Sequence, residues 1–323
     1  MVTLVTGATG LVGNNVVRML LDSGQEVRVL VREGCDPRPL QGLAVESCTG
    51  DIRDEAAVAR AAQGVEQVVH AAATVQVGWT GLQSSRAVNV QGTRNVAQAA
   101  REAGARMCHV SSVDALGISH DGPADEETPV AGTVDCPYVV TKREAEAVIQ
   151  EEVALGLHAF IVNPTYMLGR WDWKPSSGRM LLAVAAGQAR LAPPGANDFC
   201  HVEDVAAGIL TVLERGKVGR RYILGSEALS YREAWSQMAS VVGRGTPWGT
   251  AWKPVLTLAG LAGDAVGRVR GKEPDINSAS VAMSCLPHTF SHARAASELG
   301  YSPRPMREGV RDAWEFFQSY GYV

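Results

Sequence analysis

Short apolar runs alternate with longer amphipathic stretches along the first two thirds of the chain. Residues 2–5 and 27–31 are mostly apolar runs of the kind that a parallel sheet buries on both faces. Between them, apolar residues recur at helical spacing over 11–21, and Gly24 ends that stretch. The chain is therefore expected to open with a strand, a helix and a second, parallel strand.

The same alternation continues beyond this unit. It predicts further strands at 43–48, 67–70, 106–111, 158–163 and 221–224, and helices at 54–62, 82–103 and 137–155. Residues 199–204 are expected to return the chain to the same sheet, and from residue 226 onward the pattern is mainly helical. Strands that alternate with helices in this way predict a doubly wound parallel sheet.

Three glycines, Gly7, Gly10 and Gly13, lie in the turn between the first strand and the first helix. Glycine lets the chain reverse tightly, lets a pyrophosphate approach the backbone and lets the helix pack close to the strand, while the helix N-terminus offers free N–H groups to the phosphates. A plain strand-turn-helix is the alternative. We expect the turn to bind a dinucleotide, with contacts from Gly7, Thr9, Gly10, Leu11, Val12 and Gly13.

The fold class expected is α/β, with a Rossmann-type doubly wound parallel sheet and a smaller, mainly helical C-terminal lobe. Residues 1–165 would form the dinucleotide-binding domain, to which 199–225 returns, and 166–323 the substrate-binding lobe. Ligands bind at the carboxyl edge of such a sheet, where small side chains admit a flat ring. The expected contacts at this edge are Asp51, Ile52, Ala71, Ala72, Ala73, Pro164 and Thr165.

The end of the second strand distinguishes NADP from NAD. An acidic side chain there would bind the ribose hydroxyls of NAD, whereas this chain has Arg32, whose guanidinium can bind a phosphate and stack on adenine. Arg32 is thus expected to favour NADP, with NAD as the alternative, since Glu33 adjoins it and a surface arginine can lack such a role.

Candidate catalytic residues follow the fifth strand. Ser112 lies just beyond that strand, and Tyr138 and Lys142 are four residues apart, on one face of the next predicted helix. An ammonium beside a phenol favours the phenolate and is expected to lower the tyrosine pKa, so that Tyr138 serves as general acid/base. The serine hydroxyl would hold the substrate oxygen. Tyrosine and lysine at this spacing also occur by chance as a surface pair.

The amino-acid composition limits the binding partners and the cellular compartment that we expect for this protein. The 323 residues carry a net charge of −4 without a basic run, so we expect no nucleic-acid partner. The six cysteines form no CxxC pair, which is typical of free thiols in a reducing compartment, and the first strand begins too early for a signal peptide. We expect a cytoplasmic protein.

Neither a membrane span nor a metal site is expected. Residues 254–269 are fairly apolar but are interrupted by three glycines, which favours a packed helix over an interfacial membrane contact and excludes stable insertion. His288 and His292 are four residues apart, but Pro287 adjoins them and no third ligand is near. No GxSxG motif marks a nucleophilic serine.

Aromatic residues gather in the segment after the sixth strand. A substrate pocket lined by Trp79, Tyr166, Met167, Trp171 and His201 would suit an apolar or ring-shaped substrate. The alternative is that these tryptophans fill the core between the two lobes and that His201 is simply packed.

The motifs TGATGLVG, GDI, HAAA, AVNVQGTRN, VSSVDALG, YVVTK and NPTYMLG stand in the order and spacing of the extended short-chain dehydrogenase/reductases. The chain resembles this family, the NAD-dependent epimerase/dehydratases, over essentially its whole length. It looks most like the dihydroflavonol-reductase-like branch and, through VRVLVR, HVEDVAAG, RYILG and ELGYSPRP, like bacterial hopanoid-associated sugar epimerases. The resemblance implies that Ser112, Tyr138 and Lys142 are catalytic and that Asn89 orders the active-site helix. It also implies a homodimer through 82–103 and 137–155.

Departures from the family's motifs indicate which of its reactions this chain is expected to catalyse. Sugar-nucleotide dehydratases of the family carry an Asp-Glu pair where this chain has Val113 and Asp114, and the epimerases often carry a diphosphate-binding arginine where it has Asn197. We therefore expect an NADP-dependent oxidoreductase that interconverts a ketone or aldehyde and an alcohol. The alternatives are an epimerase that retains its cofactor and a cofactor-sensing binding protein.

Overall fold

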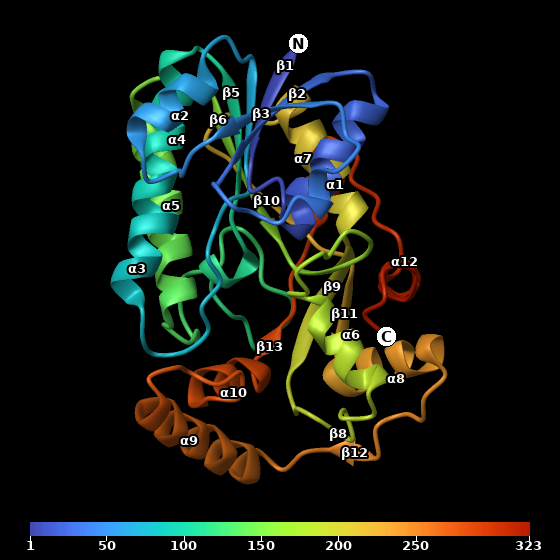
Figure 1. The fold of residues 1–323 in the computed structure, drawn as a ribbon. Helices are drawn as coiled ribbons and strands as arrows, with labels where there is room; N and C mark the ends of the chain where they lie inside the picture. Colours follow the sequence, from blue (N-terminus) through green and yellow to red (C-terminus); the bar gives the residue numbers. More distant parts are fainter.

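The computed structural model describes residues 1–323, and its largest element is a seven-stranded parallel sheet. The strand order is β10-β6-β5-β4-β1-β2-β3 (Figure 1). The strands are β1 (Val2–Thr6), β2 (Glu26–Val31), β3 (Val45–Thr49), β4 (Gln67–His70), β5 (Arg106–Val110), β6 (Ala159–Pro164) and β10 (Arg221–Leu224). All neighbours pair in parallel, which confirms the predicted Rossmann-type α/β fold.

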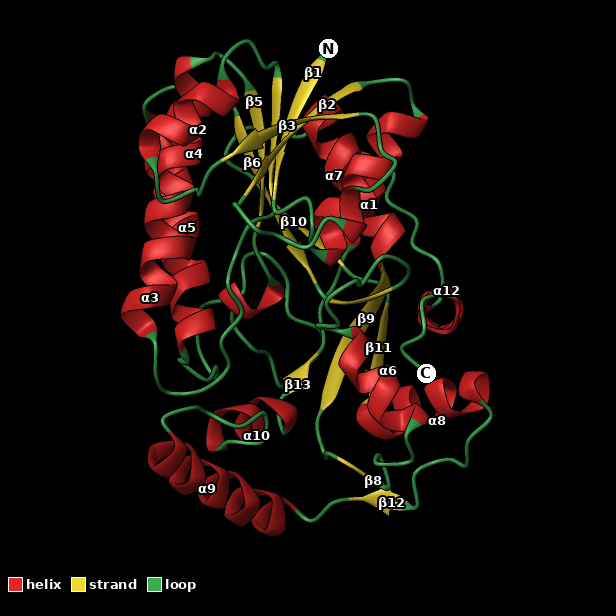
Figure 2. Ribbon diagram, viewed as in Figure 1, coloured by secondary structure: helices red, strands yellow, loops and turns green.

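Helices cover both faces of this sheet (Figure 2). On one face lie α1 (Leu11–Asp22) and α7 (Val202–Arg215), and on the other α2 (Glu55–Ala62), α4 (Gly92–Glu102) and α5 (Pro137–Ala154). Val16 and Leu20 of α1 enter one apolar core, and Val96 and Ala100 of α4 enter the other. The apolar stripe of each helix thus explains why the sheet is buried on both sides.

The order of the strands places a crevice at the carboxyl edge of the sheet. From β1 the chain adds β2 and β3 on one side and then crosses to add β4, β5 and β6 on the other. Thr6 at the end of β1 is aligned with His70 at the end of β4. Ligands of open parallel sheets bind where the strand order reverses, which here is the edge formed by the residues that follow Thr6 and His70.

The predicted helix over 82–103 is interrupted in the structure. It consists of α3 (Leu82–Arg86), a π-helical turn (Ala87–Gln91) and α4. In the π turn, Asn89 exchanges hydrogen bonds of 2.8 and 2.9 Å with the backbone of Thr74 and donates another, at 2.9 Å, to Thr141 Oγ1 of α5. π turns occur frequently at functional sites, and this one aims the Asn89 amide at two neighbouring segments.

The C-terminal lobe contains a second, smaller sheet in addition to its helices. Its strand order is β11-β9-β13, with β7 paired to β9, and a separate two-stranded pair joins β8 and β12. These strands are β7 (Tyr166–Leu168), β8 (Leu191–Ala192), β9 (Ala196–His201), β11 (Glu227–Ser230), β12 (Gly249–Thr250) and β13 (Pro287–His288). The helices are α6 (Gly178–Ala185), α8 (Tyr231–Val242), α9 (Lys253–Arg270), α10 (Ser278–Ser284), α11 (Ala293–Leu299) and α12 (Met306–Ser319). None of the helices is long and apolar enough to cross a bilayer.

One prediction about this part of the chain is wrong. Residues 199–204 do not return as a strand to the main sheet, because β9 belongs to the second sheet. Phe199 of β9 packs edge-on against Tyr166 and Tyr231, so its side chain belongs to the apolar core of the lobe. The chain returns through α7, which packs on α1, and through β10.

Candidate functional site

The glycine turn after β1 lies in contact with the end of β4. Gly7 has a φ of +76°, and a Cβ there would lie 2.6 Å from the carbonyl carbon of Ala71. A Cβ at Gly13 would collide with the carbonyl of Gly7. Only glycine fits both positions, because the turn, the helix and the neighbouring strand approach within backbone contact.

The start of α1 is open to a ligand. Its N-cap residue is Gly10, and no side chain caps the helix, so the free N–H groups of the first turn can bind an anion. The Gly10 N–H donates to the Gly7 carbonyl at 3.0 Å and closes the turn. Leu11 is buried, Thr9 and Val12 are half-buried, and Gly10 is exposed.

The residues expected near the adenosine lie beyond β2 and β3. Arg32 is exposed and forms no ion pair. Asp51 instead pairs with Arg53 at 2.9 Å, and this hydrogen bond lowers the pKa of the Asp51 carboxyl. Ile52 is buried against Gly92 of α4, where a Cβ would lie 2.6 Å from Ile52 Cδ1. The cationic side chain at this corner that remains unpaired is therefore Arg32.

Small and polar residues form the edge of the sheet between β4 and β6. Ala71 and Ala72 are half-buried and Ala73 is exposed after β4. Pro164 ends β6, and the Thr165 N–H donates to the Leu224 carbonyl of β10 at 3.3 Å. This edge therefore presents small side chains next to the glycine turn.

The structure brings Ser112, Tyr138 and Lys142 together beyond the end of β5. Lys142 is buried, donates from Nζ to the Val110 carbonyl at 2.8 Å and lies 5.9 Å from the centre of the Tyr138 ring. A hydrogen bond with the Ser112 side chain offsets part of the rise that burial causes in the pKa of Tyr138. Ser112 lies two residues beyond the end of β5, and the other two belong to the first two turns of α5, which packs on the main sheet.

Burial changes the acid–base properties expected of this trio. The pKa of Tyr138 is raised, first by burial and then by the charge of Asp114, rather than lowered by Lys142 as the sequence suggested. The pKa of Lys142 is itself lowered to about 8 by burial. Desolvation of the phenolate outweighs the attraction of an ammonium that is turned toward a backbone carbonyl.

A buried carboxylate supports the strand edge beneath the trio. Glu146, one turn beyond Lys142 on α5, accepts hydrogen bonds from Ser111 Oγ at 2.6 Å and from Asn163 Nδ2 at 2.7 Å. Arg221 of β10 reaches it at 2.6 Å. Asn163 also donates to the Ser112 carbonyl at 2.9 Å. The backbone of Ser112 is thus fixed from two strands and a helix.

Sequence reasoning missed three further residues near the trio, which are Asp114, His288 and Tyr231. Ser112 Oγ donates to Asp114 Oδ2 at 3.0 Å, and Nε2 of His288, from β13 in the other lobe, lies 3.5 Å from Asp114 Oδ1. Tyr231 faces the same space: burial raises its pKa to about 12, Asn197 donates to its hydroxyl at 3.3 Å, and the Asp114 charge acts on it. In the sequence, Asp114 was noted only as a departure from a motif. Because it is far from His288 along the chain, no sequence motif could have predicted their contact.

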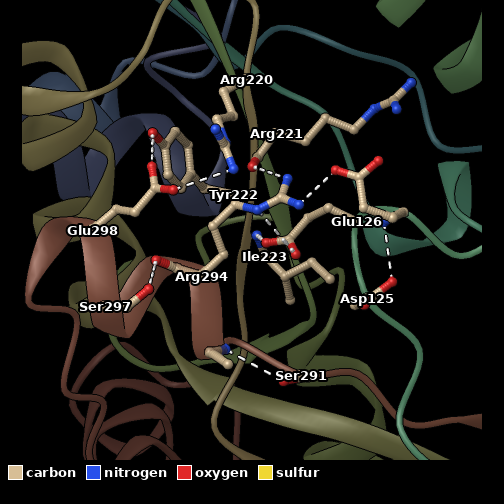
Figure 3. A network of polar contacts seen from close by, with 12 residues as sticks. Asp125, Glu126, Arg220, Arg221, Tyr222, Ile223, Ser291, Arg294, Ser297 and Glu298 are labelled. Carbon is tan, nitrogen blue, oxygen red and sulfur yellow. Dashed lines mark hydrogen bonds and ion pairs between the residues drawn. The ribbon is translucent and has the colours of Figure 1, made fainter.

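A polar network holds the segment that carries His288 in place (Figure 3). Arg294 of α11 donates to the Arg221 carbonyl at 3.2 Å and pairs with Glu127 at 2.6 Å, while Glu126 accepts the Ile223 N–H at 2.9 Å. The backbones of Ala124 and Thr289 are also hydrogen-bonded, at 2.9 Å. These contacts tie residues 289–294 to β10 and to residues 124–127, which fixes the chain directly after His288.

The predicted substrate residues are spread over several environments. Trp79 is half-exposed and donates from Nε1 to Ser278 Oγ at 2.7 Å, which places it beside α10. Tyr166 donates to the Ser177 carbonyl at 2.7 Å, and Met167 packs on the main apolar core. Trp171 stacks with Trp173 in an aromatic cluster near the C-terminus. The tryptophans after β7 therefore pack with the apolar cluster of the C-terminal lobe, and Trp171 also lies under Arg18 of α1.

His201 is held away from the cleft. It is fully buried, its Nδ1 accepts the Glu203 N–H at 3.1 Å as the cap of α7, and its Nε2 lies 3.2 Å from Asp312. The ligand atoms of His201, Glu203 and Asp312 lie within 4.8 Å of one another, but Arg304 and Arg170 already pair with the two carboxylates. His292 packs against Tyr301 rather than joining His288.

The sequence profile described as the NAD dependent epimerase/dehydratase family matches residues 3–225. The chain belongs to this family. Family and relatives comprise NAD(P)-dependent oxidoreductases, epimerases and dehydratases, and this protein is an enzyme of that kind. The glycine turn, whose backbone leaves no room for side chains, the uncapped start of α1 and the small residues of the sheet edge fit a dinucleotide cofactor.

Three known proteins resemble this epimerase/dehydratase family member over nearly their whole lengths. Sterol demethylase protein B of Methylococcus capsulatus is 35% identical, with 100% of each chain covered. A putative dihydroflavonol 4-reductase of Synechocystis is 34% identical over 99% of this chain and 95% of its own. The crystal structure of gox2253 is 37% identical, with a TM-score of 0.87 over 100% of this chain and 99% of the other.

Proposed function

We propose that this enzyme is an oxidoreductase that interconverts a ketone or aldehyde and the corresponding alcohol. The observation that carries the proposal is the meeting of Ser112, Tyr138 and Lys142 at the sheet edge beside the glycine turn. The chain has valine at the first position of the Asp-Glu pair that a family dehydratase uses, and Asn197 instead of a diphosphate-binding arginine. Both departures favour simple carbonyl–alcohol chemistry over work on a nucleotide sugar.

The residues of the chain supply the proton chemistry. When bound, the nicotinamide supplies or accepts the hydride at the carbon that bears the oxygen. In reduction, the π electrons of the carbonyl move onto its oxygen, which takes the proton of the Tyr138 hydroxyl and becomes the alcohol. The tyrosine phenolate is then reprotonated from solvent. Ser112 donates a hydrogen bond to the same oxygen. Burial raises the pKa of Tyr138, so its hydroxyl stays protonated at neutral pH and is available as the acid for reduction.

Binding residues for the cofactor follow from the geometry. The glycine turn and the N–H groups of α1 would hold the pyrophosphate, and Lys142 and Tyr138 the nicotinamide ribose. Arg32, exposed and unpaired, would bind a 2′-phosphate, so we propose NADP with NAD as the alternative. We propose further a cytoplasmic homodimer that uses the outer surfaces of α3, α4 and α5.

An apolar substrate is the class that the site favours. Asp114, His288, Tyr231 and Asn197 form a short polar edge, and the apolar cluster next to it contains Val113 and Leu116, with Leu286 packed against it. Two relatives carry names of enzymes for polycyclic compounds, a sterol and a dihydroflavonol. We therefore propose a secondary alcohol or ketone on an apolar ring system.

Cofactor titration combined with turnover tests the proposal. The purified protein is first examined for bound cofactor and is then titrated with NADPH and NADH by fluorescence. Next, a panel of apolar cyclic ketones is tested for oxidation of NADPH. The proposal expects exchangeable NADPH that binds more tightly than NADH, and one NADPH consumed per alcohol formed. Tightly retained NAD with substrate isomerisation and no net consumption would establish the epimerase instead.

Turnover by the Tyr138→Phe variant distinguishes the proposed enzyme from the alternative of a cofactor-sensing binding protein. The variant lacks only the phenolic hydroxyl, so it is expected to lose roughly 10²–10⁴-fold in turnover. It should still bind NADPH through the glycine turn and Lys142, with an affinity lowered only by the loss of one hydrogen bond to the ribose. Equal turnover of the two proteins would contradict the role proposed for Tyr138.

A further inference from the structure

An exposed apolar surface covers the outer side of α9, at the lower edge of the molecule in Figure 1. Trp248 and Trp252 are 75% and 73% exposed, Leu258 is 67% exposed and Val269 is 88% exposed. We name this surface the docking face and define it as Trp248, Trp252, Val255, Leu258, Leu261, Val266 and Val269. Contiguous exposed apolar surface of this kind marks an interaction site, whereas single exposed apolar residues do not.

The arrangement of α9 is the reverse of an ordinary amphipathic helix. Gly260, Gly263 and Gly267 face the protein, and a Cβ at Gly260 would lie 2.9 Å from Ser278 Cα. Leu258 and Val269 lie on the opposite side and face solvent. A helix that only needed to pack on the protein would turn its large apolar residues inward. Helix α9 thus packs mainly through its glycines and leaves Leu258, Leu261 and Val269 exposed to solvent.

The charges around the docking face are basic. Lys253, Arg268, Arg270 and Lys272 are exposed and form no ion pair, although the protein as a whole carries a net charge of −4. The acidic residues of the same stretch are engaged with the protein itself: Asp264 with the Ser278 N–H, Glu273 with the Trp79 N–H and Asp275 with Arg179. Unpaired positive charges therefore flank an apolar face that carries two tryptophans.

We propose that α9 binds the surface of an anionic lipid bilayer, lying parallel to it. The apolar side chains would enter the boundary of headgroups and acyl chains, the two tryptophans would lie at headgroup level, and the four basic residues would bind lipid phosphates. A second copy of this chain fits less well, because docking two such faces would bring their uncompensated cations together.

The docking face lies next to the candidate site. A cavity of about 260 Å³ is enclosed by Lys253 and Thr257 of α9, by Val281 of α10, by Cys285 and by Val134. Cys285 directly precedes the segment that carries His288 to Asp114. This binding surface stands independently of the reaction proposed above.

Co-sedimentation of the full chain with vesicles tests the proposal. Vesicles of phosphatidylcholine alone are compared with vesicles that also contain phosphatidylglycerol, at low and high salt. We expect binding to the anionic vesicles that weakens with salt and is accompanied by a blue shift of tryptophan fluorescence as Trp248 and Trp252 leave water. Absence of binding to the anionic vesicles would overturn the proposal.

Matched variants locate the binding surface. Leu258→Ser/Val269→Ser is expected to weaken vesicle binding about tenfold or more, since each substitution removes apolar area that would enter the lipid. Arg268→Gln/Arg270→Gln should weaken binding to the vesicles that contain phosphatidylglycerol and should leave any binding to pure phosphatidylcholine unchanged. Val130→Ser/Leu155→Ser removes equally exposed apolar residues outside α9 and should bind as the wild type does.

If Leu258→Ser/Val269→Ser does not fold, the Arg268→Gln/Arg270→Gln variant still tests the assignment to α9. Equal binding by all variants would place the lipid contact elsewhere and overturn the assignment to α9. A docking-face variant that converts a dimer into a monomer, in a protein that binds no vesicles, would show that a second copy covers this face and would reject the bilayer.

Discussion

Ser112 donates a hydrogen bond from its Oγ to Oδ2 of Asp114 at 3.0 Å. The other oxygen of the same carboxylate lies 3.5 Å from His288 Nε2, so the proposed catalytic serine is joined through one side chain to the second lobe. The Ser112 hydroxyl has one proton, so it cannot donate a hydrogen bond to Asp114 and to a substrate oxygen at the same time. Substrate binding would therefore exchange one acceptor for the other, and Asp114 acts as a positioning residue for the serine.

Asp114→Asn tests this relationship through the pH profile. The Asp114 charge is the second cause, after burial, of the raised pKa of Tyr138. Removing that charge should lower the Tyr138 pKa, so the pH at which alcohol oxidation reaches half its maximum rate should move to lower pH. The exposed Asp121→Asn variant is the matched control and should leave the profile unchanged. A profile unaffected by Asp114→Asn would contradict electrostatic contact with Tyr138.

Acid should destabilise the fold through His70. His70 is fully buried between Thr6 and Thr93, and burial lowers its pKa from 6.5 to about 3. Between these two pH values the unfolded chain binds a proton that the folded chain does not, so the free energy of unfolding should fall as pH falls below about 6.5.

Urea unfolding at several pH values measures this effect. His70→Gln should give a shallower loss of the free energy of unfolding below pH 6.5, at a cost of about 1 kcal/mol at neutral pH from the altered hydrogen bonds. Part of the slope should remain, because burial also lowers the pKa of the neighbouring His109. The exposed His120→Gln serves as control. An unchanged slope in His70→Gln would contradict a neutral, buried His70.

Gly13→Ala should impair the cofactor turn. The added Cβ collides with the Gly7 carbonyl, so the turn or α1 must shift, at a cost of about 1–3 kcal/mol in the free energy of unfolding. NADPH affinity, measured by fluorescence titration, should fall at least tenfold. Gly245→Ala, where nothing lies within 4 Å of the new Cβ, should change neither quantity. Normal NADPH affinity in Gly13→Ala would place the pyrophosphate elsewhere.

Arg32→Ser tests the choice between NADP and NAD. A charged hydrogen bond to the 2′-phosphate contributes about 1.5–3 kcal/mol, so NADPH affinity should fall about tenfold or more while NADH affinity stays constant. Arg60→Ser, an exposed arginine on α2, is the matched control. Parallel changes in both affinities would assign Arg32 a role other than phosphate recognition.

The parts of this protein that the sequence predicted are those encoded locally. The apolar runs and the glycine turn predicted the main sheet and its helices, because strand and helix periods are properties of consecutive residues. The interruption of the helix at Asn89 escaped prediction, since it depends on contacts of that amide with Thr74 and Thr141 in separate segments. For the same reason β9 was assigned to the wrong sheet, because its partners β7, β11 and β13 lie in three separate segments of the chain.

The candidate site divides in the same way. Ser112, Tyr138 and Lys142 stand in recognisable motifs, but their electrostatics depend on burial that no motif records, and the pKa of Tyr138 is raised rather than lowered. The approach of His288 to Asp114 rests on the network around Arg294, which joins residues from four separate segments. Aromatic residues near the cleft in sequence, such as Trp171, pack in the lobe core instead.

Deuterium transfer tests the central claim most directly. The protein is incubated with NADPH deuterated at the transferable position of the nicotinamide and with an apolar cyclic ketone, and the alcohol is analysed by mass spectrometry for wild type and Tyr138→Phe. The account predicts one deuterium on the carbinol carbon per NADPH consumed, and a rate about 10²–10⁴-fold lower in the variant. An isomerised product without net NADPH consumption, or a variant as fast as the wild type, would contradict it.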